Sequence, residues 1–201
     1  MDTARYVVAL VLTAGLLPII VFWLVIHPLA DFWRRLGAWW GYGIGLSVMA
    51  AGAAGLFLAR ESLLEVDLGT SPVLVITGIA LLVASAVMRS RIHRDFPVSM
   101  LVGLPELAPE KHPGMLITSG IYGRVRHPRY MQMAVGVLGM ALFANFVAAY
   151  VSFAAWLVGI AVVVRLEERE LRNRFGGAFD EYCRRVPRFV PRYVPTDPSR
   201  P

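Results

Sequence analysis

Long apolar blocks separated by short polar stretches dominate the pattern of this chain. Five blocks stand out, and they cover about residues 6–27, 38–59, 73–88, 128–146 and 148–164. Blocks of this length suit a hydrocarbon layer about 30 Å thick. Inside lipid every backbone N–H and C=O group needs an internal partner, and the blocks lack the alternating pattern of barrel strands. The pattern therefore predicts an all-α, polytopic membrane helix bundle of about five transmembrane helices.

Local signals refine these helices. Pro18 lies inside the first block and predicts a kink, and the glycines of the second block are small enough for a neighbouring helix to approach closely. The short turn around Asn145 predicts an antiparallel transmembrane hairpin over residues 128–165. Beyond the hairpin, the spacing of Phe179 and Tyr182 predicts a short amphipathic helix at the interface.

The distribution of positive charge predicts the orientation. Of the 20 Lys and Arg residues, 18 fall in the polar segments after the first, third and fifth blocks, and only Arg5 and Arg60 lie on the other side. Because positively charged loops stay in the cytoplasm, we predict that the N-terminus is outside and that loop 89–127 and the C-terminal tail are cytoplasmic. The Arg-rich and Ala-rich composition favours a bacterial inner membrane.

Composition also narrows the function classes. A net charge of +6 could suggest nucleic acid, but the cations sit at the ends of apolar blocks, so no nucleic-acid partner is predicted. A single cysteine, Cys183, excludes an internal disulfide and a CxxC motif. His93, His112 and His127 share one loop, but their irregular spacing does not predict a metal site.

We divide the chain into an N-terminal three-helix region, 1–90, and a C-terminal region, 91–201, that holds the candidate chemistry. The first candidate is the segment 118–130. Pro128 suits the first turn of a helix and leaves His127 near its N-cap. Unpaired N–H groups at that helix start, together with Arg126 and His127, predict a pocket for a carboxylate or phosphate. In the alternative, the arginines only mark the membrane border and His127 caps a helix.

The second candidate is the pair Glu167 and Glu168, directly below the last apolar block. Adjacent carboxylates near hydrocarbon are costly unless they are paired or used. The alternative is an ordinary helix surface with intrahelical ion pairs. The predicted hairpin places the basic helix start beside this acidic helix end, which would suit a zwitterionic ligand.

These segments together carry a family resemblance. Its elements, in order, are Ser119-Gly120-Ile121-Tyr122, Arg126-His127-Pro128-x-Tyr130, Glu167-Glu168 and a tail FGxxFxEY followed by Val186-Pro187. The combination resembles the isoprenylcysteine carboxyl methyltransferase family and the broader group of membrane methyltransferases that includes phospholipid N-methyltransferases. It covers about residues 116–191, and Phe179 stands where many relatives have Tyr.

The resemblance implies that the cofactor S-adenosylmethionine binds in the C-terminal half. It implies that His127 and Tyr130 hold the methionine part of the cofactor and that Glu167 and Glu168 bind its polar groups. The full set of predicted cofactor-binding residues is Gly120, Tyr122, Arg126, His127, Pro128, Tyr130, Glu167 and Glu168.

The predicted catalytic residues are Arg126, Arg165 and Glu168. The resemblance implies that the two arginines position an anionic acceptor. The methyl group of a sulfonium is already activated, so the protein need only align the acceptor and exclude water. A carboxylate or thiolate needs no base, whereas an amine must lose a proton to Glu168 or solvent. Because the bundle can admit an apolar tail, we expect an amphiphilic or lipid-like acceptor among membrane lipids.

Two other functions stay open at this point. Sterol-reductase-like enzymes share an RHPxY region and use NADPH, but this chain is short for them, and its EE pair and tail favour methyl transfer. A non-catalytic transporter subunit or scaffold is the second alternative. Against it, no ionisable residue falls in the middle of a predicted helix to mark a permeation path.

Overall fold

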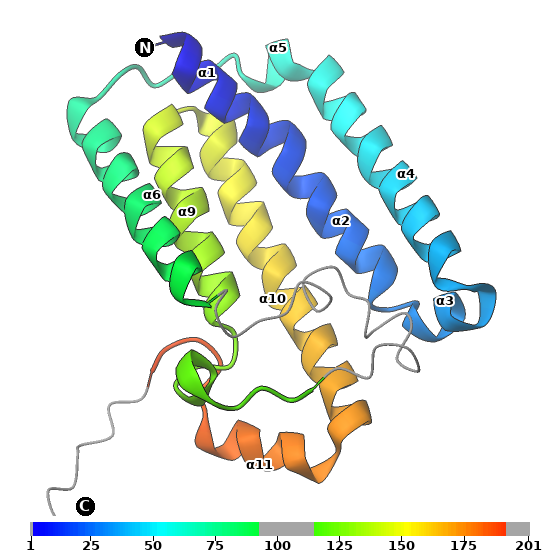
Figure 1. Ribbon diagram of the computed structural model, residues 1–201. Coiled ribbons are helices and arrows are strands. Elements are labelled where there is room, and N and C mark those ends of the chain that lie inside the picture. Colours follow the sequence, from blue (N-terminus) through cyan, green and yellow to red (C-terminus); the bar gives the residue numbers. More distant parts are fainter. Residues whose placement is uncertain (1, 93–114, 192–201) are drawn as a thin grey trace, which may run out of the picture.

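The computed structural model describes residues 2–92 and 115–191, which form a bundle of roughly antiparallel helices (Figure 1). In chain order the helices are α1 (Asp2–Val11), η1 (Leu12–Leu16), α2 (Leu17–Ile26), α3 (Ala30–Leu36), α4 (Ala38–Leu58), α5 (Arg60–Leu63), α6 (Pro72–Ile92), η2 (Gly120–Gly123), α9 (Pro128–Ala144), α10 (Val147–Phe175) and α11 (Gly177–Arg185). The long helices pack in the row α6, α9, α10, α2, α4, and α1 also contacts α9.

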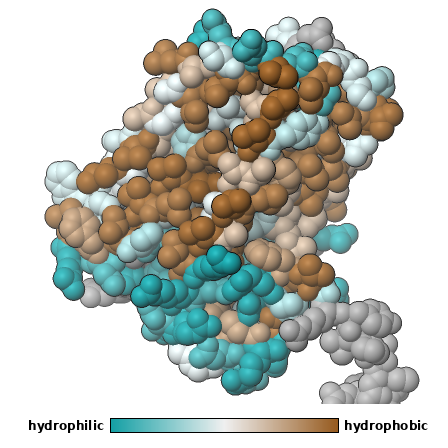
Figure 2. Space-filling model, turned by 180° about the vertical axis from the view of Figure 1, so that it is seen from behind, coloured by the Kyte–Doolittle hydropathy of each residue, from teal (hydrophilic) through white to brown (hydrophobic). Residues whose placement is uncertain are grey.

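Apolar side chains form a broad band around this bundle. Four helical stretches of the described residues are long and apolar enough to cross a membrane. The first, Thr3–Ile26, joins α1, η1 and α2, and the others are Trp39–Leu58, Pro72–Ile92 and Val147–Phe175. α9, with 17 residues, is about 26 Å long and packs against α6 and α10. Figure 2 shows hydrophobic atoms across the middle and hydrophilic atoms at both ends. The expectation of an all-α membrane helix bundle is confirmed, and the protein is an integral membrane protein.

The first transmembrane helix departs from regular α-helical geometry next to Pro18, where the sequence predicts a kink. η1 is a π-helical turn, and Pro18 lies in the first turn of α2 directly after it. Proline lacks the N–H group that would bond to the preceding turn, and its ring pushes that turn away. The wider turn accommodates both effects without ending the helix.

Glycines set the spacing between helices at two crossings. A Cβ atom on Gly45 of α4 would lie 2.9 Å from the ring of Phe22 in α2. At the second crossing, a Cβ on Gly78 of α6 would lie 2.6 Å from the backbone oxygen of Gly139 in α9. By contrast, Gly43 of α4 faces open space. The predicted role of the α4 glycines in close helix approach therefore holds at Gly45, and an equally close approach occurs between α6 and α9.

A buried arginine closes the end of the bundle that carries the N-terminus. Arg5 is 1% exposed, and its Nε donates to the backbone oxygen of Ala144 at 3.0 Å. Its Nη1 donates to Thr70 Oγ1 at 3.0 Å, and Nη2 pairs with Asp67. Asn145 lies at the predicted hairpin turn, where the structure gives it a left-handed conformation (φ 53°), and its side chain donates to the Gly69 backbone oxygen. Arg5 thus joins α1, the loop before α6 and the α9–α10 turn.

Three helical segments have no counterpart among the apolar blocks. They are α3, α5 and η2, and each has seven residues or fewer. α6 also continues to Ile92, a full turn beyond the predicted end near Met88. Helices this short carry too few apolar positions for a periodic signal, so the search for long apolar blocks does not detect them.

The close crossing of α6 and α9 predicts a stability effect. The Gly78→Ala substitution places its Cβ against backbone that cannot move aside, so the two helices must separate. We expect a loss of about 1–3 kcal/mol in the free energy of unfolding, seen as a lower thermal midpoint in detergent. Gly43→Ala, with nothing within 4 Å, is the matched control and should leave the midpoint unchanged or raise it, because alanine favours a helix more than glycine does. Equal midpoints for both variants would contradict the packing described.

The Arg5–Asp67 pair predicts a pH effect on stability. The hydrogen bond from Arg5 holds the pKa of Asp67 below its ordinary value of 3.8, against a smaller opposing effect of burial. A carboxyl group whose folded-state pKa is depressed stabilises the protein above its unfolded pKa, and that contribution disappears as pH falls through the folded value. Asp67→Asn should therefore lower the thermal midpoint at pH 6, and the difference from wild type should shrink below about pH 3.8. A difference independent of pH would contradict this assignment.

Candidate functional site

The length of α10 places two carboxylates at the membrane border. Its 29 residues span about 43 Å, which exceeds a hydrocarbon thickness of about 30 Å. If the helix enters lipid near Val147, its last third extends beyond the apolar layer from about Leu166 onward. Glu167 and Glu168 then lie where the helix emerges. The tight turn at Asn145 brings the start of α9 to the same end of the bundle, so the predicted hairpin is confirmed.

Glu168 is the centre of a buried cluster at this end. Its side chain is 6% exposed, and its Oε1 accepts hydrogen bonds from His127 Nε2 and from Arg188 Nε, each at 3.0 Å. Arg188 Nη2 bonds to the other carboxylate oxygen, and Arg126 Nη2 lies 3.2 Å from Oε1. A carboxylate only accepts, so His127 carries its proton on Nε2 in this contact. The α9 start and the α10 end meet through these charges.

Glu167 forms a second, more accessible contact beside the first. Its Oε2 accepts a hydrogen bond from Tyr130 Oη at 2.9 Å and lies 3.9 Å from His127 Nδ1. The Glu167 side chain is 28% exposed, against 6% for Glu168. Of the two predicted carboxylates, Glu167 therefore keeps more capacity for a further hydrogen-bond donor.

The tail after α11 completes the cluster. The backbone N–H of Arg126 donates to the Pro187 oxygen at 2.9 Å, and that of His127 donates to the Arg188 oxygen at 3.1 Å. The Phe189 ring lies 5.9 Å from the His127 ring. Arg188 is absent from the predicted site. The sequence signal that could have found it is its place directly after Val186-Pro187, inside the segment that carries the resemblance.

Beneath the cluster, α11 fixes the loop that precedes α9. Tyr182 is buried, and its hydroxyl donates to the backbone oxygen of Tyr122 at 2.7 Å. Burial raises the pKa of Tyr182 to about 12, so the hydroxyl stays a donor at neutral pH. Arg126 Nη1 donates to the Cys183 oxygen at 3.2 Å, and burial raises the pKa of the Cys183 thiol. The predicted amphipathic helix is confirmed, with Phe179 and Tyr182 on its buried face.

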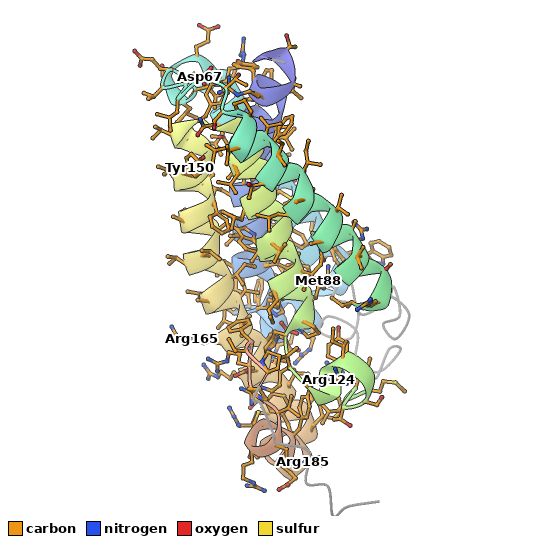
Figure 3. All side chains as sticks on the ribbon, turned by 90° about the vertical axis from the view of Figure 1, so that its left-hand side faces the viewer. Asp67, Met88, Arg124, Tyr150, Arg165 and Arg185 are labelled. Atoms are coloured by element: carbon orange, nitrogen blue, oxygen red, sulfur yellow. The ribbon has the colours of Figure 1, made fainter. Side chains whose placement is uncertain are left out.

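Most predicted site residues meet at this end, but not all in the expected way. Tyr122 and Pro128 are buried in the same region, whereas Gly120 is exposed and has a φ of +59°. Arg165 is exposed and points away from the bundle, as Figure 3 shows. It does not share in the contacts of Glu168 given above.

The anion pocket at the α9 start stays a prediction, and two backbone donors beside it are already engaged. The N–H groups of Arg126 and His127 already bond to the tail, and His127 makes no side-chain capping bond. His93 and His112 lie outside the described residues. Within residues 2–92 and 115–191, no group of three or more His, Cys, Asp or Glu side chains is arranged to hold a metal ion.

The structure thus combines a membrane helix bundle with a buried His–Glu–Arg cluster at one polar end. A family model for phospholipid methyltransferases matches residues 73–178, just over half of the 201 residues. The chain belongs to this family. The match includes α9 and α10 with both carboxylates, and it ends before most of α11 and the tail.

Curated relatives are similar over a shorter region. The chain is 38% identical over 78 residues to the cobalt-zinc-cadmium resistance protein CzcN of Cupriavidus metallidurans, which is 38% of this chain and 36% of that protein. It is 36% identical over 78 residues to the nickel-cobalt-cadmium resistance protein NccN of Alcaligenes xylosoxydans xylosoxydans, with the same coverage. It is 34% identical over 79 residues to protein-S-isoprenylcysteine O-methyltransferase of Schizosaccharomyces pombe, which is 38% of this chain and 33% of that protein.

The aligned region thus spans about a third of the length of each of these relatives. No solved structure matches the chain at a significant level.

The cluster predicts energetic coupling between the tail and α10. Removing Arg188 leaves the buried Glu168 carboxylate short of positive partners, so Arg188→Met should destabilise the wild type more than the E168Q background. We expect a coupling free energy of about 1 kcal/mol, because Arg188 is partly exposed. A double-mutant cycle of unfolding in detergent measures it. R184M, which removes an arginine paired with Glu181 on α11, is the control, and it should be additive with E168Q. Additivity of R188M with E168Q would contradict the contact.

Proposed function

We propose that this protein transfers a methyl group from S-adenosylmethionine to an amphiphilic or lipid-like acceptor at the membrane interface. The observation that carries the proposal is the buried contact between His127 and Glu168, 3.0 Å apart, with Arg126 and Arg188 around the same carboxylate. Membership of the phospholipid methyltransferase family supports it, as does the similarity to an isoprenylcysteine methyltransferase.

The residues of the cluster fit the cofactor chemically. S-adenosylmethionine carries a carboxylate, an ammonium and ribose hydroxyls, so it needs both donors and acceptors. Arg126 Nε is buried and makes no hydrogen bond within the described residues, and such a buried donor calls for a partner. Glu167 can accept from an ammonium or hydroxyl beside its bond to Tyr130. The cluster therefore offers one cationic donor from the segment before α9 and one carboxylate acceptor from α10.

The contacts favour different roles for the two carboxylates. Glu168 is occupied by His127, Arg126 and Arg188, so it holds these groups in position rather than binding ligand directly. Glu167 is then the better candidate for direct contact with the cofactor. Together with His127 and Tyr130, Glu167 forms the core of the proposed cofactor site. Gly120, Tyr122 and Pro128 would shape its wall from the backbone side.

When bound, S-adenosylmethionine supplies an activated methyl group, so the chain's residues need only orient the acceptor and keep water out. Arg126 is the proposed anchor for an anionic acceptor, whereas Arg165 could contribute only at the outer surface. If the acceptor is an amine, Glu167 rather than the fully engaged Glu168 is the better proton acceptor.

Location and organisation are proposed on the same basis. The site would face the cytoplasm of a bacterial inner membrane, with the N-terminus outside, as the 18 cations on one side favour. The division into regions 1–90 and 91–201 stays a prediction. α6, which belongs to the first region, packs closely on α9 in the second.

The NADPH-dependent reductase and the non-catalytic scaffold are weaker alternatives. The match to a methyltransferase family model weighs against both. A panel of cofactors separates the three functions: stabilisation of the purified protein by NADPH but not by S-adenosylhomocysteine would favour the reductase. No stabilisation by either would favour the scaffold.

Calorimetric titration of the detergent-solubilised protein with S-adenosylhomocysteine tests the proposed cofactor site. We expect binding by the wild type and a loss of at least about tenfold in affinity for His127→Ala and Glu167→Gln, because each removes a hydrogen bond to a charged group. E181Q makes the same chemical change on α11, where Glu181 pairs with Arg184 and Arg185, and should bind like the wild type. The absence of heat release with the wild type would contradict the proposal.

The acceptor requires a separate measurement. Radiolabelled S-adenosylmethionine, incubated with the protein and a lipid extract of its host, should yield a labelled lipid whose identity defines the acceptor atom. Label found only in water-soluble products would contradict a lipid-like acceptor.

A further inference from the structure

A polar cavity lies at the same end of the bundle as the Glu168 cluster, between the α2–α3 turn and the last part of α10. Its volume is about 310 Å³, which is within the size range of small-molecule sites. His27, Pro28, Asp31 and Arg34 line one side. The other side is a single face of α10, formed by Leu166, Arg169, Glu170, Asn173 and Arg174.

This cavity is separate from the Glu168 cluster. Glu170 follows Glu168 by two residues, which turns it by about 200° around the helix axis. The two carboxylates therefore face different neighbours: Glu168 contacts α9 and the tail, whereas Glu170 contacts Arg34 of α3. None of the residues that line the cavity takes part in the cluster of His127, Tyr130 and Arg188.

The charges in the cavity leave a positive excess. Arg34 donates to Asp31 Oδ1 at 2.7 Å and to Glu170 Oε1 at 2.6 Å, so it bridges both acidic groups. Arg169 and Arg174 add two further guanidinium groups on the α10 side. Three arginines and two carboxylates thus line the cavity, which gives these five side chains a net charge of +1. An anionic group suits this balance.

The position of the cavity along the membrane normal limits the kinds of ligand that can reach it. Trp39 and Trp40 are 87% and 63% exposed at the start of α4, next to α3. Exposed tryptophans at a helix end mark the headgroup layer of a membrane. A guanidinium group binds phosphate oxygens in a forked geometry. The anion that is abundant in the headgroup layer is the phosphate of a phospholipid.

We propose that this cavity is a binding site for a phosphate group, held by Arg169 and Arg174, with Arg34 kept in place by Asp31 and Glu170. The phosphate could belong to a phospholipid headgroup or to a soluble phosphate ester. Because Glu170 faces away from Glu168 and the cavity shares no lining residue with the proposed cofactor cluster, we assign to it an anchoring or regulatory ligand rather than the reacting acceptor. Its existence does not depend on methyl transfer.

Binding of short-chain phosphatidylglycerol to the full-length protein in detergent tests the site. We expect the R169Q/R174Q variant to bind at least about tenfold more weakly than the wild type, because two charge-assisted contacts are lost. R184Q/R185Q removes two arginines from exposed positions of α11 and is the matched control, which should bind like the wild type. Equal thermal midpoints of the two variants establish that both are folded.

Two further probes distinguish the sources of the phosphate. Binding of the lipid but not of glycerol 3-phosphate supports a membrane headgroup, and equal binding of both supports a soluble phosphate ester. Short-chain diacylglycerol, which lacks the phosphate, should not bind. Equal affinity of the wild type and R169Q/R174Q for phosphatidylglycerol would overturn the proposal, as would equal affinity for diacylglycerol.

Discussion

A carboxylate buried at the point where a helix leaves the membrane needs positive partners, because an isolated buried charge costs several kcal/mol. Glu168 meets this requirement through Arg126 and His127 before α9 and through Arg188 in the tail. The requirement therefore fixes how the start of α9, the end of α10 and the tail are arranged. The backbone bonds from residues 126 and 127 to the tail reinforce the same arrangement.

α10 connects this cluster with the contacts at the opposite end of the bundle. At the N-terminal end, its start is held by the Asn145 turn and by Arg5, which is hydrogen-bonded to the Ala144 oxygen. At the opposite end it presents Glu168 to one side and Glu170 to the other. A single helix thus separates two polar environments, one made with α9 and the tail and one made with α3. Movement of α10 would alter both together.

The sequence predicts the parts of this structure that depend on periodicity and local chemistry. The apolar blocks give the long helices, Asn145 gives the hairpin turn, and Phe179 and Tyr182 give the buried face of α11. The hairpin also brings His127 near Glu168, because the turn leaves α9 and α10 side by side. Contacts between distant segments are harder to infer. Arg188 lies 20 residues beyond Glu168 and returns to it only because α11 reverses the chain.

The contacts on the α2–α3 side of the bundle cannot be predicted from the sequence for a related reason. Its cavity depends on Arg34 reaching Glu170 across 136 residues, and neither position belongs to a motif. The family match begins at residue 73, so α1 to α5 lie outside it. Yet α2 packs on α10 and α3 supplies the partner of Glu170. A region without a family motif is therefore joined directly to the helix that carries the site, and substitutions in α2 or α3 can alter that helix without touching the family residues.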